Sequence, residues 1–207
     1  MSIIKLNDRA VSNATTFGSI SSLGEMVFIS KATASSSASI EFTSGIDSTY
    51  KEYVFYFVNI DGGFDGVNDD DYFNFNLSTD SGSNYNVVKT TTFFNSFHYE
   101  DDSASGLSYN TNGDLAQSSN KQQIARLMTV SASDACLVGY LHLFNPSSTT
   151  YVKHFIGHFQ YMGANAGRTH ETFISGYANT TSNINAIKFD FNVSTIASGD
   201  ILLFGIN

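Results

Sequence analysis

The stretch "CLVGYLHLFNPSSTTYVKHFIGHF", from Cys136 to Phe159, decides the fold of this chain. Two apolar runs of strand length stand on either side of "NPSSTT", and that connection contains the only proline of the chain, Pro146. Proline has no backbone N–H, so it fits a connection between strands and not the hydrogen-bonded interior of a sheet. The stretch therefore predicts a β-hairpin.

The same pattern extends outward from this hairpin in both directions. In "YFNFNLS", Tyr72 to Ser78, apolar residues alternate with asparagine, which is the period of a strand with one buried face. "KQQIARLMTV" carries apolar residues at helical spacing, but the surrounding β pattern favours a strand there too. "GLSYNTNGDLAQ" is predicted as a polar hairpin region, because Asn112-Gly113 is a favoured turn pair. With "EMVFIS", "SASIEFTS", "EYVFYFVNI", "NYNVVKTTTFFNSFHYE", "ETFISGYAN" and "NAIKFDFNVS", about ten strands and no helix are predicted.

The chain ends on a further strand signal, "GDILLFGIN", Gly199 to Asn207. A terminus this apolar exposes a large apolar surface to water unless it is held in place, and the run is too short to form a helix on its own. We therefore expect the final strand to lie inside a sheet. The predicted core side chains from this and the other strands are Phe55, Phe57, Phe73, Phe75, Leu141, Leu143, Phe189 and Phe204.

The predicted fold class is all-β, an antiparallel, jelly-roll-like sandwich of two sheets. Parallel strands need crossover connections, usually helices, and the sequence offers none. The sandwich is expected to cover residues 25–207. Residues 1–24 carry scattered apolar groups among small polar residues and are expected to form an N-terminal arm that docks on a neighbouring protein. The predicted docking residues of the arm are Ile3, Ile4, Leu6, Val11 and Phe17.

The charge balance argues against two classes of partner. The chain has 10 Lys and Arg against 19 Asp and Glu, a formal net charge of -9, and this disfavours nonspecific binding to nucleic acid or anionic lipid. The opening residues contain no apolar segment typical of a secretory signal, and no stretch approaches the roughly 18 apolar residues of a membrane span. We expect no nucleic-acid partner, no membrane segment and no Sec export.

The aspartate-rich stretch "DGGFDGVNDDDY" is the strongest charge feature of the chain. Dense carboxylates suit Ca²⁺, which prefers many oxygen ligands, so Asp65, Asp69, Asp70 and Asp71 form a weak candidate cation site. The spacing does not match an EF-hand loop, and acidic loops of this kind are more often solvated turns than cation sites. No other cofactor is expected.

No catalytic motif is present, so the chain is predicted not to be an enzyme. His154 and His158 lie four residues apart, which on a strand separates two potential metal ligands by roughly 13 Å, too far to share one ion. "HYEDDS" places Glu100, Asp101 and Asp102 near His98, but sequence neighbours do not show the separation across a cleft that the acid and base of a glycosidase need. Cys136 is the only cysteine and is predicted to be a buried structural thiol, because no cation stands near it in sequence.

Nearly end to end, the sequence resembles short virion structural proteins of marine tailed bacteriophages, such as those that infect cyanobacteria and SAR11 bacteria. The resemblance rests on "IIKLNDRAV", "FGSISSLG", "FTSGIDSTYKEYVFYFVNI", "GYLHLFNPSSTTYVKHF", "GYANTTSNINAIKF" and "SGDILLFGI". Proteins of this kind typically end in G-x-I-x-L-[YF]-G-I, which matches Gly199 to Ile206. The aspartate-rich loop departs from the family pattern, so no binding residue is carried over there.

The resemblance implies a component of the virion and leaves open its station, that is, whether it lies on the head or on the tail of the particle. A capsid decoration or cement protein docks on the major capsid protein through its arm, commonly as a homotrimer. A tail fibre or tailspike module instead contacts host-surface glycans through its loops. Fibres usually carry long repetitive shafts and this chain has none, so we expect a decoration protein that stabilises the head.

Overall fold

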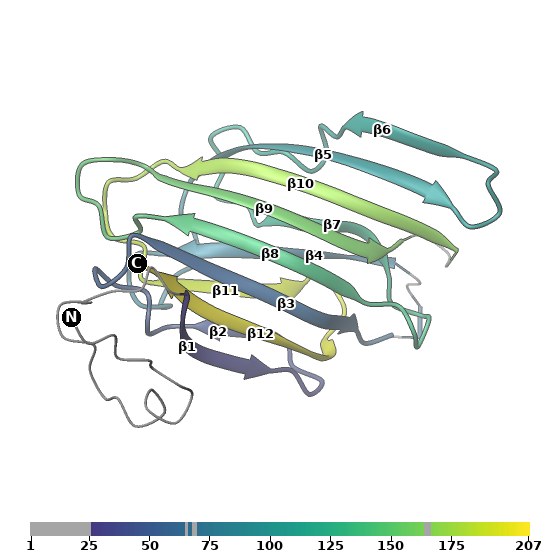
Figure 1. The fold of residues 1–207 in the computed structure, drawn as a ribbon, viewed down its shortest axis with the longest axis horizontal. Helices are drawn as coiled ribbons and strands as arrows, with labels where there is room; N and C mark the ends of the chain where they lie inside the picture. The colour runs from purple at the N-terminus through teal and green to yellow at the C-terminus, as the bar shows by residue number, and fades with distance from the viewer. Residues whose placement is uncertain (1–25, 65, 68–69, 164–166) are drawn as a thin grey trace, which may run out of the picture.

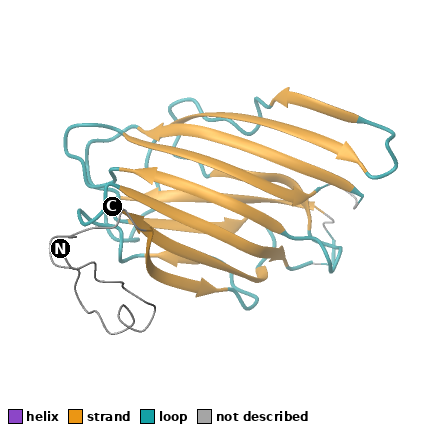
Figure 2. Ribbon diagram, viewed as in Figure 1, coloured by secondary structure: helices purple, strands orange, loops and turns teal. Residues whose placement is uncertain are grey.

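The structure is a computed structural model that describes residues 26–64, 66–67, 70–163 and 167–207. None of the described residues is in a helix, and Figure 2 shows only strands and loops. Twelve strands lie in the described part. They are β1 Met26–Thr33, β2 Ile40–Phe42, β3 Glu52–Gly62, β4 Asp70–Ser78, β5 Lys89–Tyr99, β6 Ser105–Tyr109, β7 Gln122–Thr129, β8 Leu137–Phe144, β9 Lys153–Met162, β10 Arg168–Ala178, β11 Ala186–Phe191 and β12 Ile196–Ile206.

The strands form two sheets that pack face to face. The large sheet has eight strands in the order β1-β12-β3-β8-β9-β10-β5-β6, and the small sheet has four in the order β2-β11-β4-β7. Every strand pairing is antiparallel. In Figure 1 the small sheet lies behind the middle and lower strands of the large sheet, while β6 sits at the upper edge. The predicted all-β antiparallel sandwich is confirmed, and its jelly-roll character stays a prediction.

The predicted hairpin is β8 and β9, which pair with Leu141 opposite Gly157. The ambiguous "KQQIARLMTV" is strand β7, as expected. In the polar region, Ser105–Tyr109 forms β6 beside β5, and the hydrogen bond from Gly113 N to Asn110 O closes a turn there. The sequence therefore located the strands well but did not assign their neighbours across the sheets.

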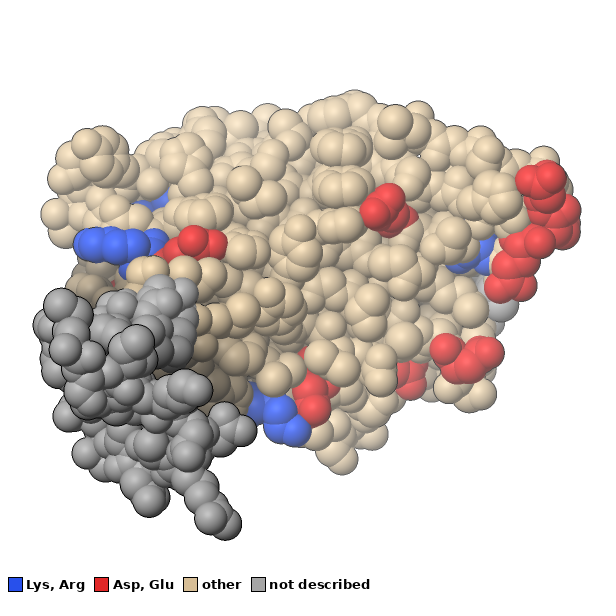
Figure 3. Space-filling model, viewed as in Figure 1, with Lys and Arg blue, Asp and Glu red and all other residues tan. Residues whose placement is uncertain are grey.

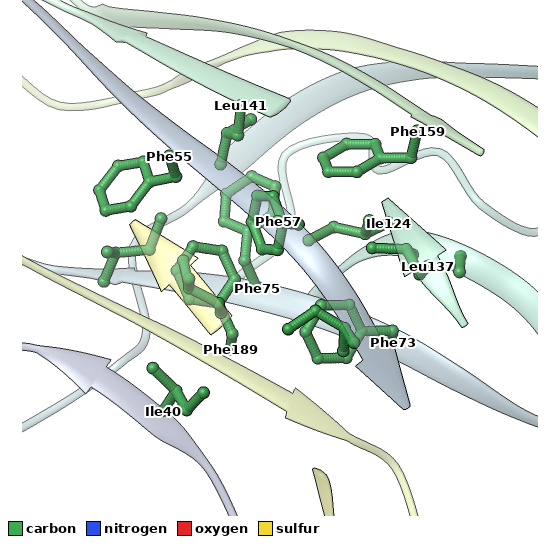
Figure 4. Close-up of a cluster of buried hydrophobic side chains, with 14 of the residues drawn as sticks. Ile40, Phe55, Phe57, Phe73, Phe75, Ile124, Leu137, Leu141, Phe159 and Phe189 are labelled. Atoms are coloured by element: carbon green, nitrogen blue, oxygen red, sulfur yellow. The ribbon is translucent and has the colours of Figure 1, made fainter. Parts of the chain in front are cut away.

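The core between the sheets is built largely of phenylalanine rings (Figure 4). Phe57 of the large sheet meets Phe189 of the small sheet edge to face, with ring centroids 5.0 Å apart. Phe75 meets Phe155 in the same way at 5.2 Å. Such edge-to-face pairs favour contact between the positive edge of one ring and the negative face of the other. The predicted core residues that prove buried are Phe55, Phe57, Phe73, Phe75, Leu141, Leu143 and Phe189.

Phe204 is the exception, because it is half-buried and lies on the opposite face of the large sheet. Its neighbour Leu203 is fully buried and pairs with Phe55, so Leu203 takes the inward position. Successive side chains of a strand point to opposite faces, and the continuous run "ILLF" could not show which of the two faced the core.

The final strand lies inside the large sheet, as predicted. β12 pairs with β1 on one side and with β3 on the other. The expected arm, residues 1–24, lies outside the described residues. Among the described residues no helix has the length and apolarity needed to cross a membrane.

Candidate functional site on the outer face of the large sheet

The outer face of the large sheet, which points away from the small sheet, carries a line of aromatic side chains. Phe55 and Phe57 of β3 point into the core, so Tyr56 between them points outward. Tyr56 stands directly opposite Tyr140 of β8, and Tyr140 opposite His158 of β9. The line continues from His158 to Phe173 of β10 and from Phe173 to Phe94 of β5.

These rings touch one another across the sheet. Tyr56 and Tyr140 have centroids 6.2 Å apart, and Tyr140 and His158 5.8 Å. At the β1 end the line adds two edge-to-face contacts, Tyr56 with Phe204 at 5.8 Å and Phe204 with Phe28 at 5.6 Å. We call these seven residues the outer aromatic row: Phe28, Phe204, Tyr56, Tyr140, His158, Phe173 and Phe94.

Several rings of the row stack face to face on one another. His158 stacks on Phe173 with centroids 4.2 Å apart, and Phe173 stacks on Phe94 at 5.0 Å. Side chains stand roughly perpendicular to a sheet, so rings stacked along it present mainly their edges to the outside. Phe28 and Phe94 are 56% and 40% exposed, far more than the side chains of the core. The row is therefore an apolar, edge-on surface.

Charged side chains are few over the middle of the outer face, and three of them contact a basic or imidazole group of their own subunit. His158 Nε2 lies 2.7 Å from Glu171 Oε1, and Lys31 Nζ lies 3.0 Å from Asp200 Oδ2. Glu52 is paired with Nδ1 of His142. In Figure 3 the broad face toward the viewer is almost wholly uncharged, with red and blue patches gathered mainly at its margins. The face therefore offers mainly apolar contact surface.

Two shallow hollows flank the row toward the two ends of the strands. One, of about 440 Å³, is lined by apolar and aromatic groups that include Phe144, Ile156 and Tyr177. The other, of about 320 Å³, is lined by more polar groups that include Ser96, Gln160 and Glu171. Both are open depressions in which a partner's side chains can be seated.

A third hollow lies elsewhere on the molecule, not on the outer face of the large sheet, and it is polar. It measures about 390 Å³, and its lining is rich in amides, with Asn74, Asn120, Gln123 and Lys121 among the residues around it. Lys121 Nζ lies 2.8 Å from Asp190 Oδ2, so its charge is paired. This hollow offers hydrogen-bonding groups and little apolar surface.

The candidate cation site is not assembled by the residues that the structure describes. Asp65 and Asp69 lie outside the described residues. Asp71 is buried, and its carboxylate accepts backbone hydrogen bonds from Tyr72, Val193 and Ser194 at 2.7 to 2.9 Å. Asp70 accepts a hydrogen bond from the Thr129 hydroxyl at 3.2 Å. Asp71 thus ties the start of β4 to the connection between β11 and β12. Within the described ranges no three His, Cys, Asp or Glu side chains gather as metal ligands.

The predicted docking residues of the arm, Ile3, Ile4, Leu6, Val11 and Phe17, lie outside the described residues. His154 and His158 share the outer face of β9, as their spacing predicted, and His158 is engaged by Glu171. In "HYEDDS", His98 Nε2 lies 3.1 Å from Asp102 Oδ1 at the exposed end of β5.

Cys136 is half-buried and not fully buried as predicted. Burial, aided by the negative charge of Asp61, raises the pKa of its thiol. A raised pKa lowers the fraction of thiolate at neutral pH, and the thiolate is the reactive form. The expected inert character of this thiol therefore has a physical basis in the structure.

Sequence reasoning missed the outer aromatic row. Its members come from seven strands, and they form a line only because of the register between strands. A signal was present, since "EYVFYFVNI" and "GYLHLF" carry aromatic residues on both faces of their strands. A strand that is apolar on both faces needs a cover for each face.

Comparison of the chain with known protein families, curated proteins and solved structures finds no match.

Proposed function

We propose that this chain is a structural component of a bacteriophage particle, a decoration or cement protein that docks on the major capsid protein and stabilises the head. The observation that carries the proposal is the broad, weakly charged outer face with its aromatic row, which is typical of a protein that assembles with other subunits. Aromatic enrichment and charge depletion are the compositional marks of the centre of a protein interface. The resemblance to phage structural proteins supplies the setting, and no catalytic activity is assigned.

A shell-stabilising subunit has physical requirements that agree with this chain. The strands bury a large aromatic core without any disulfide, since the chain has one cysteine. The acidic balance, a net charge of -9, disfavours nonspecific binding to the packaged genome. A homotrimer is the expected assembly, because it would sit on threefold or quasi-threefold points of the shell and clamp neighbouring capsomers. Docking is assigned to the arm residues Ile3, Ile4, Leu6, Val11 and Phe17.

Copy number tests the station of the protein. Quantitative mass spectrometry of purified particles, with the major capsid protein as internal reference, gives the number of copies per virion. A decoration protein repeats with the shell lattice, so its copies must stand in a fixed ratio to the major capsid protein. A copy number that matches only the few symmetric positions of a tail would contradict the head station, and absence from particles would contradict the whole proposal.

A second candidate function is a tail-associated module that binds host-surface glycans. The polar hollow lined by Asn74, Asn120, Lys121 and Gln123 favours it, because amide and ammonium groups hydrogen-bond sugar hydroxyls. The outer aromatic row does not favour it, because sugars stack on free ring faces and these rings stack on each other. A glycan-array screen tests the candidate, and Gln123→Ala should abolish any specific binding that it finds.

A further inference from the structure

None of the described residues covers the outer face of the large sheet, and the composition of this face indicates which partner it fits. We propose that a second copy of this chain packs against this face, centred on the outer aromatic row. The inference concerns the isolated protein, so it does not depend on the station of the protein on a phage particle.

The size of the face matches what a stable protein interface needs. The row crosses seven strands, from β1 to β5, and six strand spacings of about 4.8 Å give a width of about 29 Å. Along β9 the outward side chains run from His154 to Met162, about 26 Å at roughly 3.3 Å per residue. The product, about 750 Å², is close to the roughly 800 Å² per partner of a standard interface.

The charges of the face favour a second copy over a different protein. Glu52, Glu171 and Asp200 each have a basic or imidazole partner within their own subunit. These three carboxylates are thus already engaged within their own subunit, which leaves them less available for recognition by a partner of opposite charge. An apolar surface is complementary to another apolar surface, and interfaces between identical chains are the more apolar ones.

The shape of the face also suits sheet packing. Two sheets that pack face to face interdigitate the side chains of their facing surfaces at a separation of about 10 Å. The row provides ridges, and the hollows around Ile156 and around Gln160 provide places for the partner's ridges. Ile156 itself is 51% exposed in one subunit, although it stands in the middle of a central strand.

The net charge sets the salt dependence of this association. Two chains of charge -9 repel each other at long range, and salt screens that repulsion over a Debye length of about 10 Å at 0.1 M. Association through the apolar face should hold or tighten as the salt concentration rises. Docking on a basic partner would weaken instead.

The test is the mass of the purified full chain by sedimentation equilibrium, from about 0.05 M to about 0.5 M salt. Wild type should have the mass of two or more chains at every salt concentration. Tyr140→Glu, at the centre of the row, and Ile156→Glu, beside it, should each weaken association by about thirty-fold or more. Tyr151→Glu is the matched control, because Tyr151 is an exposed tyrosine in the connection between β8 and β9.

Circular dichroism and thermal melting must show that each variant is folded. Ile156→Glu guards against the unfolding of Tyr140→Glu, because more of the Ile156 side chain already lies in water. A monomeric wild type at the highest soluble concentration would overturn the proposal and leave the face to a different protein or a glycan. So would an oligomer whose mass is unchanged in both folded variants. Neither result bears on the copy number in virions, so the proposed function is tested separately.

Discussion

Lys89 is a buried lysine with no carboxylate partner among the described residues. Its side chain is fully buried, and its ammonium donates to Asn76 Oδ1 at 2.5 Å and to the Val87 carbonyl at 2.8 Å. Burial lowers the pKa of Lys89 from 10.5 to about 7. Neutral oxygens satisfy the ammonium as a donor, but they do not replace the hydration that a full charge loses.

The sign of the resulting pH dependence follows from proton counts. Between pH 7 and 10.5 the unfolded chain holds a proton on Lys89 that the folded chain has released, so the free energy of unfolding rises with pH in that window. Lys89→Met should flatten this rise, by an amount on the order of a few kcal/mol across the window. Urea titrations at several pH values measure it, with Lys51→Met as an exposed control. Equal slopes in wild type and Lys89→Met would contradict the account.

His170 makes a second buried titration. Its ring stacks on Tyr161, with centroids 5.1 Å apart, and neither of its nitrogens has a hydrogen-bond partner among the described residues. Burial, together with the positive charge of Arg168, lowers the pKa of His170 from 6.5 to about 4. The unfolded chain therefore binds the proton first as the pH falls.

The folded chain should accordingly lose stability as the pH falls from 6.5 to about 4. His170→Phe keeps a ring on Tyr161 and removes the titration, so its melting temperature should fall less than that of wild type over this range. His154→Phe changes an exposed histidine and serves as the control. The prediction fails if the two variants lose the same number of degrees.

At the scale of elements, β12 depends on a glycine at an irregular point of its pairing with β3. The register shifts between Ser198 and Asp200, and Gly199 between them has φ +112°. A Cβ atom there would lie 2.4 Å from the carbonyl oxygen of Asn59. Such a backbone conformation and contact are open to glycine alone.

Gly199→Ala should therefore lower the free energy of unfolding by about 1–3 kcal/mol or more. The neighbouring Ser198→Ala changes an exposed side chain and should be close to neutral. Chemical denaturation of the two variants beside wild type measures the difference. A Gly199→Ala protein as stable as Ser198→Ala would show that the bulge is not required.

Removal of the last strand should also destabilise the sheet. Residues 201–207 supply the partner of both β1 and β3, so their removal opens two pairings and exposes the core at Phe55. The truncated chain should be insoluble or unfolded, whereas Asn207 alone is exposed and should be dispensable. Soluble yield and thermal melting decide the matter, and a truncated protein with native-like melting would contradict the role given to β12.

The strands could be predicted from the sequence because each signal is local. Alternation in "YFNFNLS" and the proline in "NPSSTT" depend only on neighbouring residues. Phe204 and the outer aromatic row could not be predicted in this way, because their positions depend on which strands are neighbours and in what register. The candidate cation site stays a prediction, because Asp65 and Asp69 lie outside the described residues. Asp71 is used by Val193 and Ser194, residues far along the chain.

At the scale of the whole molecule, the two sheets do different work. The small sheet covers the inner face of the large sheet and completes the aromatic core (Figure 4). The large sheet then has a second apolar face that nothing in the described part of its own chain covers. The sandwich therefore closes its own core but leaves one apolar sheet face open to contact, which suits a protein whose proposed role is assembly.

Cryo-electron microscopy of whole particles tests the central claim most directly. We predict density for the sandwich repeated over the lattice of the head, with the outer face of the large sheet packed against another copy of the chain. The side chains of Tyr56, Tyr140 and Phe173 should be at the centre of that contact. Sandwiches confined to the tail, or standing on the head with this face open to solvent, would contradict the account.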